Sequence, residues 1–139
     1  MKTNIATTAS QSQRLLRCGV SADTADMCWI APNRLVTGGV GFPTLMCAEY
    51  FKHDDSIQQT PAWSLSALLG LLLFKIHSGK YEYWLDIAPM DYGKQWSIGY
   101  YCMEKPRVIK GLTHTDSLIE CAVQEIEWLS KNGYKLNEQ

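Results

Sequence analysis

The sequence predicts a single α+β domain, and three observations carry that prediction. Residues 115–134 have the apolar spacing and both end signals of one amphipathic helix. Tyr81–Ile87 and Gln95–Cys102 are rich in aromatic and β-branched residues and flank a Gly-containing loop, as in a β-hairpin. A leucine-rich helix follows Pro61. We therefore expect an N-terminal αα-hairpin, a central helix and a small antiparallel sheet of about three strands covered by a C-terminal amphipathic helix.

Length and composition fit one globular domain. The chain has 139 residues, a length that buries roughly two-thirds of the unfolded surface. Residues 1–9 are polar and predict a disordered or frayed lead-in, so the domain is expected to span residues 10–139. The formal net charge of −1 argues against a strongly basic protein that binds nucleic acid or a membrane surface.

The sequence also predicts a cytoplasmic protein. Its longest apolar run, Leu65–Phe74, is far shorter than the ~20 residues that a membrane span needs. The polar N-terminus lacks the apolar core of a signal peptide. The five cysteines are odd in number and have no C-x-x-C spacing, which favours free thiols over a disulfide scaffold.

The N-terminal αα-hairpin is predicted from helix end signals. Ser10 and Gln13 can form a capping box, and Gly19 lies where the first helix would end. Ser21 can begin a second short helix that runs through Met27. A DNA-binding helix-turn-helix has this layout, but the second helix would carry two aspartates and no cation, so DNA phosphates would repel it.

Residues 29–60 give weak signals. The pattern predicts a strand at Leu35–Thr37, a Gly-rich loop at Gly38–Pro43, a strand at Leu45–Phe51 and an exposed loop at His53–Thr60. The Gly-rich loop lacks the Gly-Lys-Ser/Thr ending of a phosphate-binding loop, so it is interpreted as a structural turn.

Composition and the spacing of apolar residues predict the central helix and the sheet. The helix should run from Ser64 to Leu73, and its leucines cover more than one face, which predicts the most buried helix of the domain. After this helix, apolar and polar residues alternate with a period of two, as in a β-strand. A third strand is expected near Arg107–Leu112, and Pro106 would confine it to an edge of the sheet.

The C-terminal helix has the clearest pattern in the chain. Asp116 or Ser117 can cap it, and Ser117 with Glu120 fits a capping box. Asn132-Gly133 supplies its C-terminal end. Five apolar residues fall on one face: Ile119, Ala122, Val123, Ile126 and Leu129. We expect this face to pack on the sheet.

No residue pattern predicts a catalytic, cofactor or metal site. The histidines His53, His77 and His114 lack a second ligand at metal-binding spacing. No nucleophile motif surrounds any cysteine, although folding could bring a cysteine near a histidine. Asp54 and Asp55 are typical of a solvated loop.

Alternation in the first hairpin strand predicts a candidate interface. If Tyr81, Tyr83, Leu85 and Ile87 face the core, period two places Glu82, Trp84 and Asp86 on the opposite face. A large aromatic between two carboxylates is a poor core element, but it is a reasonable anchor for a contact. Trp84, Glu82 and Asp86 are therefore the predicted interface residues.

Three segments carry a resemblance. They are Leu15-Leu16 with Gly19-Val20 and Thr24–Met27, then Pro61–Leu65 with Ala67–Leu69, and finally Ile119-Glu120 with Glu127–Leu129 and Asn132–Tyr134. In these segments the chain resembles small uncharacterised proteins found in Bacteroidales genomes, prophages and mobile elements. The resemblance implies an origin and assigns no catalytic or binding residue.

The leading functional hypothesis is a small non-enzymatic accessory protein of a phage or mobile element. Its partner would be another protein or a second copy of itself, with no cofactor, no metal, no membrane and no nucleic acid. The alternative is a small enzyme that uses a Cys/His group in a pocket between the sheet and the helices.

Overall fold

The computed structural model describes residues 5–32, 44–47, 57–104 and 109–137. The helices are α1 (Ala9–Arg17), α3 (Leu65–Leu71) and α4 (Leu118–Lys131), with 3-10 turns η1 (Ala22–Thr24) and η3 (Asp91–Gly93). The strands are β1 (Met27–Pro32), β2 (Thr44–Cys47), β3 (Ile57–Ala62), β4 (Lys75–Ser78), β5 (Tyr81–Met90), β6 (Gln95–Cys102) and β7 (Ile109–Thr115). No described helix is both long and apolar enough to cross a membrane, and the longest has 14 residues.

The predicted architecture is wrong, because the described strands form two antiparallel sheets. The orders are β2-β1-β3 and β4-β5-β6-β7. The second helix of the predicted αα-hairpin is replaced by one 3-10 turn and strand β1. Ser21 does cap η1, but Ala25 is already extended and β1 begins at Met27. Pairing with β2 on one side and β3 on the other stabilises this strand, and such long-range pairing overrides a local helix start.

Strand β3 corrects a second prediction. The loop expected at His53–Thr60 ends in a strand, since Ile57–Ala62 pairs with all six residues of β1. The predictions for Leu35–Thr37, Gly38–Pro43 and residues 48–56 lie outside the described residues. Residues 44–47 form β2, in agreement with the strand predicted from Leu45.

The predicted hairpin is confirmed, and its sheet is larger than expected. Strands β5 and β6 pair from Tyr83↔Cys102 to Met90↔Gln95. The predicted third strand exists as β7, shifted toward the C-terminus, and it pairs with β6. Strand β4, which was not predicted, adds the fourth strand beside β5.

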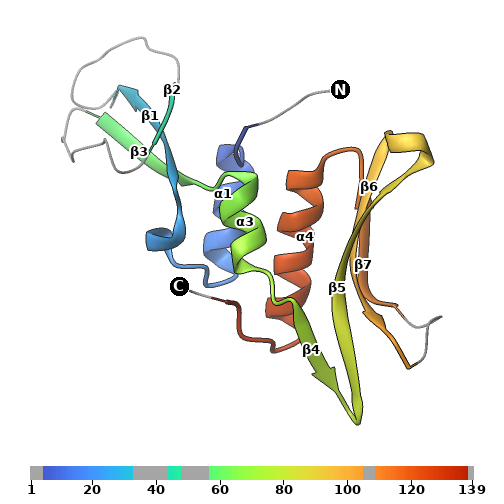
Figure 1. The fold of residues 1–139 in the computed structure, drawn as a ribbon. Helices are drawn as coiled ribbons and strands as arrows, with labels where there is room; N and C mark the ends of the chain where they lie inside the picture. The colour runs from blue at the N-terminus through green and yellow to red at the C-terminus, as the bar shows by residue number, and fades with distance from the viewer. Residues whose placement is uncertain (1–4, 33–43, 48–56, 105–108, 138–139) are drawn as a thin grey trace.

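Helix α4 is the centre of the molecule. It packs on the four-stranded sheet with one side, and α1 and α3 cover its other side (Figure 1). The five predicted stripe residues are all buried, which confirms that face. Seven residues of α4 are buried but only Leu68 and Leu71 of α3, so the prediction that the central helix would be the most buried one is wrong.

The N-terminal segment is hydrogen-bonded to the residues just before α3. Ala6 bridges Ser64, and the buried Thr7 hydroxyl contacts Ser12 Oγ at 2.8 Å and accepts from Trp63 N at 3.0 Å. The capping box of α1 uses Thr8 and Gln11 rather than the predicted Ser10 and Gln13. Residues 5–9, predicted as part of a frayed lead-in, therefore dock α1 against the neighbouring strand end.

Candidate protein-binding face

The four-stranded sheet has one covered face and one face that no described helix covers. Helix α4 packs against the first (Figure 1). On the second, which we call the outer face, the β5 side chains Glu82, Trp84 and Asp86 are exposed. On the covered face Tyr83 is buried, and Tyr81, Leu85 and Ile87 pack against the core. The alternation predicted for this strand is confirmed.

One row of large side chains crosses the outer face from edge to edge. Cross-strand pairing places Lys75 opposite Trp84, Trp84 opposite Tyr101, and Tyr101 opposite Ile109. We call these four residues the aromatic row. Directly opposed side chains on one sheet face are close enough to touch, so the row forms a continuous strip. Trp84 is 40% exposed and Ile109 is 45% exposed.

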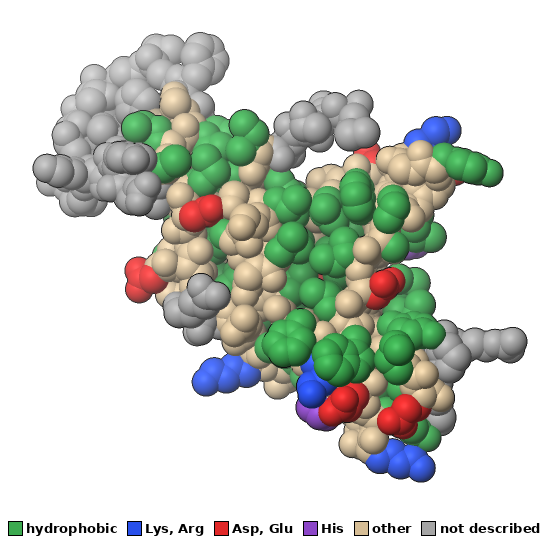
Figure 2. Space-filling model, in the orientation of Figure 1, with side chains coloured by type: hydrophobic (Ala, Val, Ile, Leu, Met, Phe, Trp, Pro, Cys, Tyr) green, Lys and Arg blue, Asp and Glu red, His purple; other side chains and the backbone are tan. Residues whose placement is uncertain are grey.

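Charged side chains surround Trp84 at one end of the row. The Lys75 ammonium lies 5.1 Å from the centre of the Trp84 ring and 3.4 Å from Glu82 Oε1. His77 Nδ1 lies 3.9 Å from the same Glu82 oxygen, and the Phe74 ring centre lies 6.2 Å from that of Trp84. Figure 2 shows hydrophobic side chains beside a small cluster of basic and acidic ones over β4 and β5. The arrangement is an aromatic centre with a polar rim, which is typical of protein contact surfaces.

A glycine and a bulge extend the apolar surface beyond the row. The pairing of β6 with β7 shifts between Ile98 and Tyr100, so Gly99 faces an extra residue of β7. A Cβ at Gly99 would lie 2.9 Å from Ile109 Cγ2 and 3.4 Å from the Leu112 backbone. The absent side chain lets β7 bulge over β6, and Leu112 is left 53% exposed on the outer face.

A buried carboxyl lies beneath this bulge, on the covered face. Glu125 of α4 is fully buried, and neither of its oxygens has a hydrogen-bond partner among the described residues. Burial raises the pKa of Glu125 to about 8, and the Thr113 hydroxyl beside it lowers that pKa slightly. Thr113 donates instead to the carbonyls of Ile98 and Cys121, each at 3.4 Å. Glu125 is therefore a neutral acid at neutral pH.

Glycine at position 111 makes room for that carboxyl. Gly111 has φ +63°, and a Cβ there would lie 2.5 Å from Glu125 Oε1 and 2.6 Å from Trp128 Cε3. Burial, with a smaller contribution from the charge of Glu125, raises the pKa of Tyr100, whose hydroxyl donates to Leu73 O at 2.6 Å. Sequence patterns do not reveal this group, because a glutamate on the buried side of a helix interrupts the apolar spacing that identifies that side.

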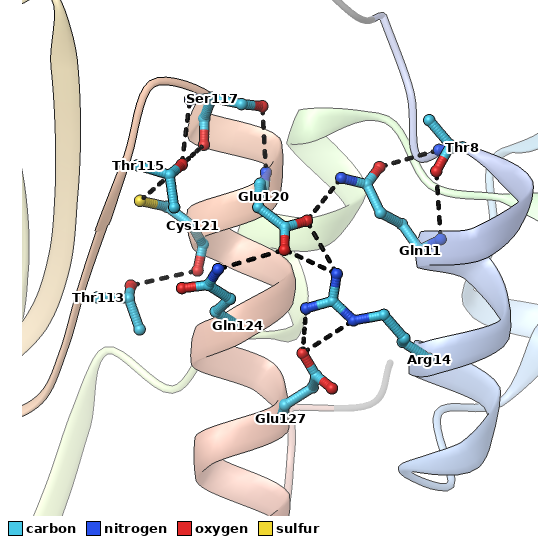
Figure 3. A network of polar contacts seen from close by, with 10 residues as sticks. All are labelled: Thr8, Gln11, Arg14, Thr113, Thr115, Ser117, Glu120, Cys121, Gln124 and Glu127. Atoms are coloured by element: carbon cyan, nitrogen blue, oxygen red, sulfur yellow. Dashed lines mark hydrogen bonds and ion pairs between the residues drawn. The ribbon is translucent and has the colours of Figure 1, made fainter.

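A polar network joins α1 to α4 and has a structural role (Figure 3). The Arg14 guanidinium donates to Glu127 and, at 2.7 Å, to Glu120, which also accepts from Gln11 at 2.7 Å. Burial opposes ionisation of Glu120, but the hydrogen bonds from Arg14, Gln11 and Gln124 outweigh it, and its pKa lies below the ordinary value. The hydrogen bond to Glu127 raises the pKa of Arg14.

This network changes the predicted capping box of α4. Ser117 Oγ does accept from Glu120 N at 3.2 Å, as predicted. The Glu120 carboxylate does not return to the cap, because it binds Arg14 and Gln11. The network therefore fastens two helices, and its charged groups leave no carboxylate free for acid–base chemistry.

The described cysteines and histidines do not converge. Cys121 is fully buried; its thiol donates to Trp96 O at 3.1 Å and contacts Thr115 Oγ1 at 3.6 Å. His114 is exposed on β7, opposite Ser97, and His77 is 65% exposed on β4. Within the described ranges no three His, Cys, Asp or Glu side chains are grouped to hold a metal ion. His53, Asp54 and Asp55 lie outside those ranges.

An open groove of about 540 Å³ lies between η1 and α3. Asp23, Asp26, Gly70 and Asn137 are among its lining residues. Asp26 accepts from the backbone and hydroxyl of Ser64, the N-cap residue of α3. The polar groups of Asp26 are therefore used to cap a helix, and the groove holds no convergent set of reactive side chains among the described residues.

Comparison with known protein families, curated protein sequences and solved structures finds no match to this chain.

Proposed function

We propose that this chain is a non-enzymatic protein-binding protein whose contact surface is the outer face of the four-stranded sheet. The observation that carries the proposal is the aromatic row: Lys75, Trp84, Tyr101 and Ile109 cross a sheet face that no described helix covers. Antiparallel sheets with one solvated face usually present polar side chains on it. Exposed aromatic and aliphatic side chains grouped there favour a contact with another protein.

The binding free energy expected from an aromatic anchor also favours this face as the contact surface. Truncating an aromatic anchor at the centre of an interface commonly costs ~2 kcal/mol or more of binding free energy. Trp84 lies in a central strand of the sheet, with Phe74 and Lys75 on one side and Tyr101 on the other. Glu82 and Asp86 form the polar rim beside it. Glu82 is paired with Lys75, whereas Asp86 forms no ion pair with any described residue.

We further propose that the protein acts in the cytoplasm as an accessory of a phage or mobile element. The support for this part is the resemblance of three segments to small proteins of such elements, together with a chain whose described helices include no membrane span. The binding proposal does not depend on this origin.

Site-specific photo-cross-linking tests the binding proposal. A diazirine amino acid at Leu112, on the outer face, should form covalent adducts with another protein chain in cells that express the protein. The same amino acid at Gln13, an exposed position on α1, is the matched control and should form far fewer. Equal adduct yields at the two positions, or none at Leu112, would contradict the proposal.

A further inference from the structure

We propose that the partner on the outer face is a second copy of this chain, stacked face to face about a two-fold axis. The inference rests on the proposed function and names its partner. Soluble homo-oligomers are most often two-fold dimers, in which the same patch of each subunit contacts itself. The outer face has the arrangement of side chains that such a contact requires.

The aromatic row is self-complementary about one axis. The two central strands of the sheet are β5 and β6, and each contributes one aromatic to the row, Trp84 and Tyr101. An axis that lies in the plane of the contact and runs between these strands places Trp84 of one copy over the partner's Tyr101, and the reverse. The edge residue Lys75 then lies over the partner's Ile109. Aligned sheets pack about 10 Å apart in this way with their inner side chains interdigitated.

The second position along the strands places charge near the same axis. Asp86 is paired across the sheet with Gly99. The axis therefore brings each Asp86 over the partner's Gly99, beside the Ile109 and Leu112 side chains that lie over that glycine. The two Asp86 carboxylates then lie on either side of the axis, and their like charges weaken the contact.

The size of the face indicates a weak dimer. Strand β5 has 10 residues, which at ~3.3 Å per residue extends ~33 Å. Four strands at ~4.8 Å spacing give a face of at most roughly 630 Å², since the edge strands β4 and β7 are shorter than β5. A standard interface buries ~800 Å² on each partner. The face is smaller than this, as is typical of weak, transient contacts, so we expect a dissociation constant in the micromolar range.

Analytical ultracentrifugation of the full chain tests the inference. The wild type should pass from monomer to dimer across micromolar concentrations. Trp84→Ser removes one anchor from each copy, so it should raise the dimer dissociation constant about thirtyfold for each anchor, or roughly a thousandfold in all. The matched control is Tyr92→Ser, because Tyr92 is a fully exposed aromatic on η3, outside the aromatic row. It should leave the constant unchanged.

Asp86→Asn distinguishes a second copy from any other partner. It removes the two like charges beside the axis, so it should tighten the dimer several-fold, and the gain should shrink as salt is raised. A dimer that Trp84→Ser weakens but Asp86→Asn does not tighten would overturn this axis. Far-ultraviolet circular dichroism of each variant checks that it is folded.

The sedimentation and cross-linking experiments together distinguish a failure of this inference from a failure of the proposed function. A wild-type chain that stays monomeric at high concentration, while Leu112 still cross-links to a different protein, overturns the second copy and leaves the binding face in place. A dimer that is unaffected by Trp84→Ser overturns the stacked arrangement. Monomeric behaviour without cross-links at Leu112 overturns both.

Discussion

At the scale of single residues, Glu125 is the group whose environment departs most from its ordinary one. Its carboxyl is fully buried beneath the β7 bulge, without a described hydrogen-bond partner. The ionisable group facing it from β6 is Tyr100, and from β7 it meets Gly111 and Thr113. Burying a charge without a partner is costly, so the folded state keeps this proton to a higher pH than the unfolded chain does.

The pH dependence of stability follows from that difference. The pKa of Glu125 is raised to about 8 in the folded state, so between about pH 4.5 and pH 8 the folded chain binds one proton that the unfolded chain does not. The stability that Glu125 contributes is fully present below the unfolded pKa and is lost as pH rises through the folded pKa, at up to about 1.4 kcal/mol per pH unit.

Glu125→Gln should remove this slope, so the variant gains stability over the wild type as pH increases. Urea unfolding from pH 5 to pH 8 measures it, with the exposed Glu82→Gln as the control. Parallel pH profiles for wild type and Glu125→Gln would contradict the assignment.

A second residue-scale prediction concerns the glycine that covers this carboxyl. Gly111→Ala should cost several kcal/mol, because the new methyl group would meet Glu125 and Trp128 and the backbone has φ +63°. Gly133→Ala is the matched control: φ is +79° there, but nothing lies within 4 Å of the added methyl. It should cost about 1 kcal/mol from backbone strain alone. Similar losses in chemical denaturation would show that β7 does not press on the carboxyl.

At the scale of elements, α4 shows which features can be predicted from patterns of neighbouring residues. Its buried stripe, its Ser117 cap and its terminal Gly133 could be predicted, because each depends on neighbours within a few residues along the chain. The hairpin of β5 and β6 could be predicted from period two. The sheet β2-β1-β3 could not, since its order depends on pairing Met27 with Ala62, 35 positions apart. Strand β3 is also polar and contains Pro61, which favoured a loop followed by a helix start.

The candidate face could be predicted from the sequence only in part, because most of it depends on pairing between strands. Alternation in β5 was enough to place Trp84, Glu82 and Asp86 on one side. Tyr101, Ile109 and Leu112 join them only through register with β6 and β7, and through the bulge opposite Gly99. No pattern within one segment encodes that register.

Helix α4 gives a prediction about its two sides. Ile126→Ala should cost roughly 2–5 kcal/mol, since the side chain is fully buried in the core and a cavity would remain. Glu127→Ala removes a hydrogen-bonded partner of Arg14, but both side chains are partly exposed, at 35% and 28%, and Arg14 keeps Glu120. This loss should stay below about 1 kcal/mol. If denaturation gave equal losses for the two variants, the orientation of α4 would be wrong.

At the scale of the whole molecule, thiol reactivity reports on the arrangement of both sheets and the helices between them. All five cysteines are free: Cys47 is exposed, Cys18 is half-buried, and Cys28, Cys102 and Cys121 are buried. Burial raises the pKa of the Cys18 and Cys28 thiols, which slows their reaction further. Thiol titration of the native protein should therefore find Cys47 labelled first, and denaturation without reductant should release all five. Rapid labelling of Cys121, or fewer than five thiols after denaturation, would be inconsistent with this core.

The most direct test of the outer face as a contact surface combines binding and stability in one variant. Trp84→Ser should lower the unfolding free energy by only about 1 kcal/mol, because Trp84 lies outside the core. In the same variant, the yield of photo-cross-links from Leu112 should fall, by up to about thirtyfold where the partner is below its dissociation constant and the change costs ~2 kcal/mol of binding. A stable Trp84→Ser protein that has lost its cross-links is the result expected here. A variant that unfolds, or one that is stable and cross-links as well as the wild type, would contradict the role of Trp84 as the anchor of this face.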